Sequence, residues 1–319
     1  MELEFVDFLK NALPPHPQLR LGVGDDAAVL RLAERADCVV TSDLLAEGTH
    51  FTRSEATPEQ IGRKALAVNL SDLAAMAARP LAATVSLLLP RREAAPLARS
   101  LLAGMLPLAA EFNVAIAGGD TNCWDGPLVV AVTALGESTT ECKFRRDAAR
   151  SGDAVVVSGE LGGSRAGKQF DFRPRVNEAL RLAAEFDVHA AMDVSDGLLL
   201  DLSRICAASR CGAELNLASV PVAAAARAPV AVRSSSLGEG SLAQLEPHLA
   251  RALTDGEDFE LLLTMPAEEA ARLTRDNTFD LRWTVIGRIA AESGLRGVDA
   301  SDKSIPLAPI GFEHGADKS

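Results

Sequence analysis

The stretch Gly22-Val23-Gly24-Asp25-Asp26-Ala27-Ala28-Val29-Leu30 places two adjacent aspartates between glycines and a run of small apolar residues. The apolar run indicates that both carboxylates lie at the edge of a packed element and not on a solvated surface. Adjacent carboxylates repel each other, and burial penalises the charge of each. A hard cation would relieve both costs, so the stretch predicts a metal site whose other ligands lie elsewhere in the chain.

Length and composition indicate a soluble globular protein with room for two domains. The chain has 319 residues, of which 48% are hydrophobic and 24% charged. No apolar run reaches the roughly 18 residues that a membrane span needs. The acidic start of the chain argues against a signal peptide. We therefore expect a cytoplasmic location, and five cysteines without a Cys-x-x-Cys pair predict reduced thiols.

The charge balance excludes one class of partner and raises a question about another. There are 32 basic and 44 acidic residues, which gives a net charge of −12. A nucleic-acid partner is therefore not expected, because neutralising phosphates requires a basic face. A phosphorylated substrate would also be repelled, unless bound cations reverse the local field.

Strands and helices alternate along the first half of the chain, which predicts a layered α/β (α+β) domain. The expected helices cover residues 2–13, 58–78 and 93–112, and the expected strands cover 38–44, 82–89, 114–117 and 128–135. Residues 145–153 are polar and charged and read as a linker. We therefore expect an N-terminal domain over 1–148 and a C-terminal domain over 149–319.

The second domain is expected to carry strands at 154–158, 261–265 and 283–289 and a helix at 198–209. A glycine-rich turn, 159–164, follows the first of these strands. The structure of 221–240 is left open, because its composition is low in complexity.

Acidic residues recur beside Gly, Ser, Thr or Asn, mostly where an apolar run ends. They are Asp25, Asp26, Asp43, Asp72, Asp120, Asp193, Asp196, Glu257 and Asp258. Any one alone reads as a helix cap or turn residue. Because the pattern recurs, and because strand ends converge in layered α/β folds, we expect these acidic residues to line one crevice. Oxygen donors without a histidine or cysteine cluster suit several Mg²⁺ ions, and several Mg²⁺ ions suit polyphosphate chemistry.

Other residues suit phosphate contacts, although each has an ordinary structural reading as well. The glycine pairs 118–119 and 162–163 can bring backbone N–H groups to phosphate oxygens, but such pairs are more often tight turns. Arg146 can reach a phosphate or simply be solvated, and His50 can contact a phosphate or fill space. Walker and dinucleotide motifs are absent from the sequence, as is a nucleophile elbow, so direct transfer is favoured over a covalent intermediate.

Six motifs in order resemble those of the thiamine-monophosphate kinases, within the superfamily named after aminoimidazole ribonucleotide synthetase. They are Gly-Val-Gly-Asp-Asp-Ala-Ala at 22–28, Thr-Ser-Asp at 41–43 with His50, Ala-Val-Asn-Leu-Ser-Asp-Leu-Ala-Ala-Met at 67–76, Gly-Gly-Asp-Thr at 118–121, Asp-Val-Ser-Asp-Gly-Leu at 193–198, and Asp-Gly-Glu-Asp-Phe-Glu-Leu at 255–261. The resemblance covers most of the chain, from about Gly22 to about Ile289.

The resemblance implies a two-domain fold, a homodimer whose N-terminal sheets pair, and ATP-dependent phosphorylation of thiamine monophosphate to thiamine diphosphate. It implies that the metal ligands for Mg²⁺ are Asp26, Thr41, Ser42, Asp43, Asp72, Asp120, Asp193 and Asp196. It implies ATP contacts from Gly118, Gly119, Asp120, Arg146 and Ser195, and substrate contacts from His50 and Glu257. Phe312 is a further candidate for the substrate.

Two departures from the family pattern leave questions open. Residues 167–191 look shorter than the usual helical segment, and Pro309 stands where an aromatic residue is expected to stack on thiamine. Phe312 or Trp283 would replace that ring, or else both pack in the core. The alternatives are another ATP-using member of the superfamily and a catalytically weak, regulatory protein that binds Mg-nucleotide.

Overall fold

The structure is a computed structural model, and it describes residues 19–21, 25, 28–32, 36–138, 144–228, 241–276, 278–299 and 301–313. The chain folds into two compact units. The first unit comprises Pro14–Cys142 and Gln169–Leu180, and the second comprises Met1–Leu13, Lys143–Lys168 and Arg181–Ser319. The domain boundary at 148/149 stays a prediction, and the helix expected over 2–13 lies outside the described residues.

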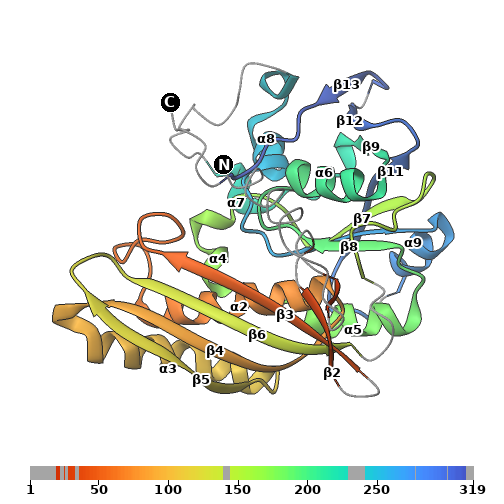
Figure 1. The fold of residues 1–319 in the computed structure, drawn as a ribbon. Coiled ribbons are helices and arrows are strands. Elements are labelled where there is room, and N and C mark those ends of the chain that lie inside the picture. Colours follow the sequence, from red (N-terminus) through yellow and green to blue (C-terminus); the bar gives the residue numbers. More distant parts are fainter. Residues whose placement is uncertain are drawn as a thin grey trace. The chain divides into compact units, whose positions relative to one another are not determined.

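The first unit contains a six-stranded sheet in the order β1-β2-β3-β6-β4-β5. Its strands are β1 (Leu19–Leu21), β2 (Ala28–Leu32), β3 (Ala36–Ala46), β6 (Val129–Ser138), β4 (Arg79–Pro90) and β5 (Ala115–Trp124). All neighbours run antiparallel except β4 and β5, which run parallel. Helices α2 (Pro58–Ala75) and α3 (Ala94–Glu111) lie along one face of the sheet (Figure 1), which confirms the layered α/β class.

Helix α2 begins where its sequence predicts, because its start is encoded locally. Thr57 accepts a hydrogen bond from the Gln60 N–H, the Gln60 side chain accepts one from the Thr57 N–H, and Pro58 occupies the first turn. The helix ends at Ala75, three residues before the predicted end at 78. Most of its residues are buried, since it packs against β3 and β6 of the sheet and against α3.

Two glycines let α2 and α3 approach each other closely. A Cβ on Gly62 would overlap the carbonyl oxygen of Leu101, and a Cβ on Gly104 would overlap that of Glu59. The two overlaps involve backbone atoms, which no side-chain rotation relieves. The crossing therefore depends on glycine at both positions.

Gly104→Ala is expected to destabilise the protein despite alanine's better helix propensity. Overpacking typically costs about 1–3 kcal/mol, against a gain of about 1 kcal/mol from the Gly-to-Ala change in a helix. Backbone overlap falls at the upper end of that range, so we expect a net loss of about 2 kcal/mol. Urea unfolding of the variant measures it. An unchanged or higher midpoint would show that the two helices separate at little cost.

Strand β5 is longer than the sequence predicts. The prediction covers 114–117 and puts Gly-Gly-Asp-Thr beyond the strand end, but the strand continues to Trp124 and includes that motif. Gly118, Gly119 and Asp120 pair with Thr84, Val85 and Ser86 of β4. A Cβ on Gly119 would overlap the Val85 carbonyl, which explains a glycine inside this strand.

The second unit contains a seven-stranded sheet in the order β13-β12-β9-β11-β7-β10-β8. The strands are β7 (Ala154–Ser158), β8 (Ala190–Asp193), β9 (Gly212–Asn216), β10 (Leu261–Met265), β11 (Trp283–Ala290), β12 (Gly294–Val298) and β13 (Ser304–Leu307). The α-helices after α3 are α4 (Lys168–Asp171), α5 (Val176–Glu185), α6 (Leu198–Ser209), α7 (Ala224–Arg227), α8 (Pro247–Thr254) and α9 (Ala267–Leu273), and 3-10 turns cover Arg91–Glu93, Ser164–Ala166, Leu217–Ser219 and Ser241–Gln244.

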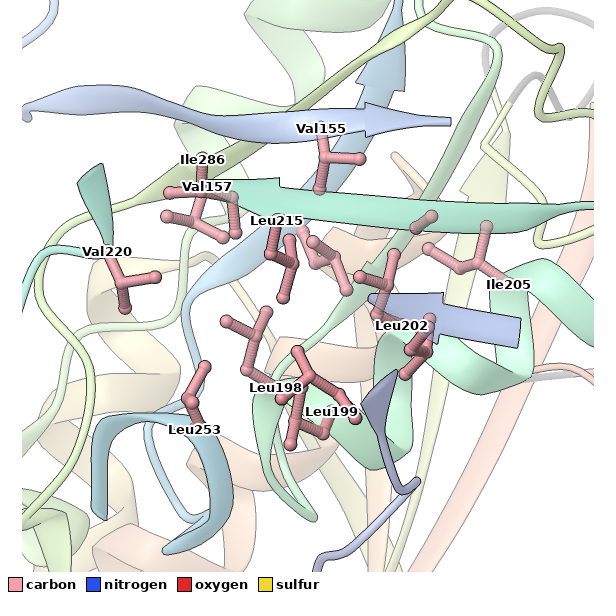
Figure 2. Packing of buried hydrophobic residues seen from close by; sticks show 14 of the residues in the cluster. Val155, Val157, Leu198, Leu199, Leu202, Ile205, Leu215, Val220, Leu253 and Ile286 are labelled. Atoms are coloured by element: carbon pink, nitrogen blue, oxygen red, sulfur yellow. The ribbon is translucent and has the colours of Figure 1, made fainter. Parts of the chain in front are cut away.

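The core of the second unit lies between this sheet and α6 with α8. Figure 2 shows Val155 and Val157 of β7 on one side of this cluster and the leucines of α6 on the other, with Leu253 of α8 near Leu198. Helix α6 has the predicted bounds, 198–209. This packing fixes the start of α6, and Ser195 and Asp196 lie in the loop immediately before it.

Two strands near the end of the chain are absent from the prediction, which ends with the strand at 283–289. They are β12 and β13, and both follow β11. β13 contains Pro306 and lies at the edge of the sheet, where a residue without an N–H is tolerated. Across the ranges that the structure describes, every helix is too short or too polar to cross a lipid bilayer.

Candidate functional site

Strand alternation and α2 bring together three of the predicted ligands in the first unit. Thr41 and Asp43 of β3 pair with Ala134 and Val132 of β6, and both β6 residues are buried. Thr41 and Asp43 therefore share the face of the sheet that α2 covers. The Thr41 hydroxyl donates a hydrogen bond to Asp72 Oδ2 on α2. Hydroxyl and carboxylate oxygens thus gather between β3 and α2.

Ser42 lies on the opposite face of β3. Its hydroxyl is 2.8 Å from that of Thr133 on β6, and the residue is exposed. The structure does not bring the Ser42 side chain to Asp72. Its role as a metal ligand stays a prediction from the resemblance.

Asp120 is separated from Asp43 by three of the five strand spacings in the sheet. Strands β6 and β4 lie between β3 and β5. Three strand spacings of about 4.8 Å put the two backbones about 14 Å apart. One Mg²⁺ ion, with ligands at about 2.1 Å, does not span that distance. Within one sheet, Asp120 and Asp43 would therefore serve different ions.

The donors in the first unit fit Mg²⁺ in kind. They are carboxylate and hydroxyl oxygens, the donors that hard cations prefer. Among the described residues, no three His, Cys, Asp or Glu side chains lie close enough to hold a metal ion. Asp26, which is predicted to complete the set, lies outside the described residues.

In the second unit, the loop after β8 carries Asp193, Ser195 and Asp196. Asp193 ends the strand and is 1% exposed, whereas Ser195 and Asp196 are half-buried. The loop turns sharply into α6 through Gly197, whose φ is 115°. A Cβ there would also meet the backbone of Thr254 at 2.9 Å. Glycine at this position lets the carboxylates of Asp193 and Asp196 stand close to the start of α6.

Asp201 braces this loop from the first turn of α6. Its Oδ2 accepts the N–H groups of Ser195, Asp196 and Gly197 at 3.1, 3.0 and 3.1 Å. Its Oδ1 accepts a hydrogen bond from Arg204 at 2.7 Å. Burial, with the negative charges of Asp196 and Asp193, raises the pKa of Asp201 well above its ordinary value, while Arg204 opposes the shift.

Arg204 also holds one of the predicted ligands directly. Its Nη1 lies 2.6 Å from Asp196 Oδ2. Burial opposes the charged form of Arg204, but Asp201 and Asp196 together keep its pKa above the ordinary value. The charge of Arg146 acts on Arg204 too, so the two guanidinium groups lie within electrostatic reach. Arg146, a predicted ATP contact, thus belongs to the surroundings of this loop.

The segment 255–260 is hydrogen-bonded to the same loop. The Glu257 N–H donates to the Ser195 carbonyl at 2.7 Å, and the Phe259 N–H donates to the Val194 carbonyl at 2.8 Å. Glu257 and Phe259 have φ values of 61° and 50°, which are costly for residues other than glycine. This strained backbone places Glu257 beside Ser195.

The C-terminal segment reaches the loop as well. The Phe312 N–H donates to the Asp196 carbonyl at 2.8 Å, and the guanidinium of Arg165 lies 5.4 Å from the Phe312 ring centre. Trp283 is only 5% exposed and packs edge-on against Phe279 at 5.6 Å. Trp283 therefore has the core role, and Phe312 is the aromatic ring near the candidate site.

The glycine turn after β7 is engaged within the second unit. The Gly162 N–H lies 2.9 Å from each carboxylate oxygen of Asp258, Ser164 donates to the same carboxylate, and the Gly163 N–H donates to Asp255 at 3.0 Å. Burial raises the pKa of Asp258 to about 7, against these hydrogen bonds and the charge of Lys168, which lower it. The suggested phosphate contacts of 162–163 are thus replaced by carboxylates from the chain itself.

His50 lies in a loop of the first unit after β3. Its Nδ1 accepts the Ala46 N–H at 3.0 Å, and its carbonyl accepts a hydrogen bond from Lys64 Nζ at 3.0 Å. In the neutral ring the proton is then on Nε2, which makes Nε2 a donor suited to an anion.

The structure reveals supporting residues that the sequence patterns do not single out. They are Asp201, Arg204 and Lys64. Asp258 is a partial case, because the sequence marks it as one of several acidic residues but does not indicate its contact with the glycine turn. Lys64 has a visible signal, because it interrupts an otherwise apolar helical face with Ile61, Ala65 and Val68. The role of Asp201 depends on the loop conformation and has no comparable sequence signal.

Comparisons with known proteins show which family the chain is similar to. Family models of the AIR synthase related protein match the chain, the N-terminal domain over residues 24–138 and the C-terminal domain over 150–300. The thiamine-monophosphate kinase of Rhodopirellula baltica is 39% identical over 322 residues, covering 99% of this chain and 98% of that protein.

Solved structures are similar over nearly the whole chain. The thiamine-monophosphate kinase from Stenotrophomonas maltophilia has 34% identity and a TM-score of 0.71, covering 92% of this chain and 95% of its own. A structure of AaThiL complexed with AMPPCP and TMP has 27% identity and a TM-score of 0.79, covering 98% of this chain and 96% of its own.

Proposed function

Because this chain belongs to the thiamine-monophosphate kinases, a family of AIR synthase related proteins, we propose that it phosphorylates thiamine monophosphate with ATP, giving thiamine diphosphate and ADP. The observation that carries this proposal is the hydrogen bond between Glu257 N–H and the Ser195 carbonyl. It puts an expected substrate contact beside an expected ATP contact. Direct transfer between two bound phosphates requires such proximity.

For this reaction the protein chiefly has to align the two phosphates and neutralise their negative charge. A phosphate oxygen of thiamine monophosphate is already an anion, so it needs no general base to attack the γ-phosphorus. Residues proposed to hold Mg²⁺ are Asp26, Thr41, Ser42, Asp43, Asp72, Asp120, Asp193 and Asp196. Bound there, Mg²⁺ would neutralise charge on the phosphates and help to hold them in line.

The remaining proposed contacts would orient ATP and thiamine monophosphate. Gly118 and Gly119 lie on the edge strand β5, one side of which has no partner strand in the described sheet, so N–H groups on that side suit ATP phosphates. Arg146 and Ser195 complete the ATP contacts. His50 would donate from Nε2 to the acceptor phosphate, with Glu257 and Phe312 on the rest of that substrate.

We also propose a homodimer and a cytoplasmic location. The family resemblance is the basis for the dimer, because it implies that the N-terminal sheets of two copies pair; Leu44, which is 56% exposed on the face of the first sheet away from α2, is accessible to a second copy. Cys38, Cys123, Cys206 and Cys211 are free, which suits a reducing compartment. Light scattering of the purified protein tests the dimer.

Purified protein with ATP, thiamine monophosphate and excess Mg²⁺ is expected to form thiamine diphosphate, and chelating the metal with EDTA should stop the reaction. Chromatographic separation of the thiamine phosphates measures the product. Free thiamine serves as the control acceptor, because it lacks the anionic oxygen. No product, or equal use of free thiamine, would refute the proposal. ATP binding without product would favour the regulatory alternative.

A further inference from the structure

Lys64 is a fully buried lysine in the middle of α2. It is 0% exposed, although lysine is almost never buried completely unless its charge is held by partners. Its Nζ donates to the His50 carbonyl at 3.0 Å and to Gln169 Oε1 at 2.6 Å, and it lies 5.3 Å from the ring centre of Phe170. Burying an ammonium group is costly, so these contacts indicate that Lys64 does more than fill space in the core.

Its neighbour Arg63 contacts the same segment through different groups. Arg63 Nη1 and Nη2 donate to the carbonyls of Phe170 and Phe172 at 3.0 and 2.6 Å. Residues Gln169–Leu180 belong to the first unit, so these are contacts within that unit. Arg63 attaches the 169–172 segment to α2, whereas Lys64 joins that segment to the His50 loop. The two neighbours therefore have separable tasks.

Lys64 supplies one of the contacts that hold His50 in place. The Ala46 N–H holds the ring through Nδ1 at 3.0 Å, and Lys64 holds the backbone carbonyl. With both fixed, the direction of the Nε2–H bond is set. Gln169 in turn keeps Lys64 Nζ in place, and it is itself only 6% exposed. A chain of contacts thus runs from Gln169 through Lys64 to His50.

We propose that Lys64 and Gln169 are positioning residues for the acceptor-phosphate half of the site, and that they act by fixing His50. This inference rests on the proposed function, because it assigns His50 to thiamine monophosphate. The buried positive charge of Lys64 also favours an anion beside His50. Because Nδ1 accepts the Ala46 N–H, Nε2 is the ring nitrogen that can donate to that anion.

The test compares three substitutions in the full-length protein after wild-type turnover has been established. Gln169→Leu removes the acceptor at nearly constant volume and is expected to raise KM for thiamine monophosphate about tenfold, with KM for ATP changed less than about twofold. Gln169→Glu keeps an acceptor for Lys64 and should restore a near-wild-type KM. Arg63→Gln is the matched control, because it loosens the same segment while leaving the Lys64–His50 contact in place, and it should leave the KM ratio unchanged.

A spectroscopic measurement separates positioning from general loosening. The chain has five histidines, so the ring nitrogen signals of His50 can be assigned by NMR against a His50→Gln variant. Gln169→Leu should reduce the Nε2–H tautomer of His50, and Arg63→Gln should not. Equal changes in both KM values, or the same His50 spectrum in Gln169→Leu as in wild type, would overturn the proposal. Wild-type protein without turnover would instead refute the proposed function.

Discussion

Asp43→Asn and Asp72→Asn are each expected to lower kcat by about a thousandfold or more, which corresponds to about 4 kcal/mol of barrier. Asparagine keeps the size of the side chain, and at position 72 it still offers Thr41 an acceptor oxygen. The loss would therefore come from the missing negative charge and not from a collapsed fold. Steady-state kinetics at saturating Mg²⁺ measure kcat, and a thermal melt of each variant shows whether the fold is kept.

Asp37→Asn provides the matched control for this pair. Asp37 lies on β3 on the same face as Thr41 and Asp43, and it is 7% exposed, but it is outside the six motifs. The same chemical change there should leave kcat within about threefold, because position 37 lies outside the six motifs, and the thermal melt of this variant reports any loss of stability from the buried position. Near-wild-type turnover in Asp43→Asn or Asp72→Asn would remove that residue from the site.

Asp201→Ala is expected to cost both stability and activity. The substitution leaves three neighbouring N–H groups of the 195–197 loop without their acceptor and Arg204 without one of its carboxylates. Unsatisfied buried groups cost about 1–3 kcal/mol each, and we expect a total of about 3–5 kcal/mol, since the groups relax together. Activity should fall at least about a hundredfold, because Ser195 and Asp196 would lose their placement.

Two further variants show whether this loss comes from the loop. Asp201→Asn keeps an acceptor oxygen for the N–H groups and should recover most of the stability. Asp299→Ala removes a carboxylate that accepts the N–H groups of Ser301 and Lys303 in an exposed turn of the same unit. Its effect should stay below about 1 kcal/mol, because water replaces the acceptor there. If Asp201→Ala behaves like Asp299→Ala in urea unfolding, the bracing role is wrong.

The parts of the fold that local chemistry encodes could be predicted from the sequence. The start of α2 follows from Thr57, Pro58 and Gln60, and the bounds of α6 follow from Gly197 and the apolar spacing after it. The prediction for strand β5 is too short, because two glycines read as a turn. Pairing with β4 supplies hydrogen bonds that outweigh the weak strand propensity of those glycines. Strand β13 was missed for a similar reason, because Pro306 argues against a strand when only the sequence is considered.

The candidate site was predictable by residue type but not by arrangement. The motifs identified Ser195, Asp196 and Glu257, and the structure places them together. That Asp201 would brace their loop, or that Lys64 would reach Gln169, depends on contacts across the folded chain. Lys64 and Gln169 are 105 positions apart in the sequence. Short-range patterns carry no information on such pairs.

The attachment of residues 169–172 to α2 has an evolutionary consequence. The first unit draws part of its structure from a segment that follows the first strand of the second unit in the chain. A recombination event with a single crossover near residue 148 would join α2 to a foreign version of that segment. Arg63 and Lys64 would then face carbonyls and an acceptor that did not evolve with them. The two halves of the gene are therefore expected to be inherited together, and viable chimeras should be those that carry residues 169–180 along with the first unit.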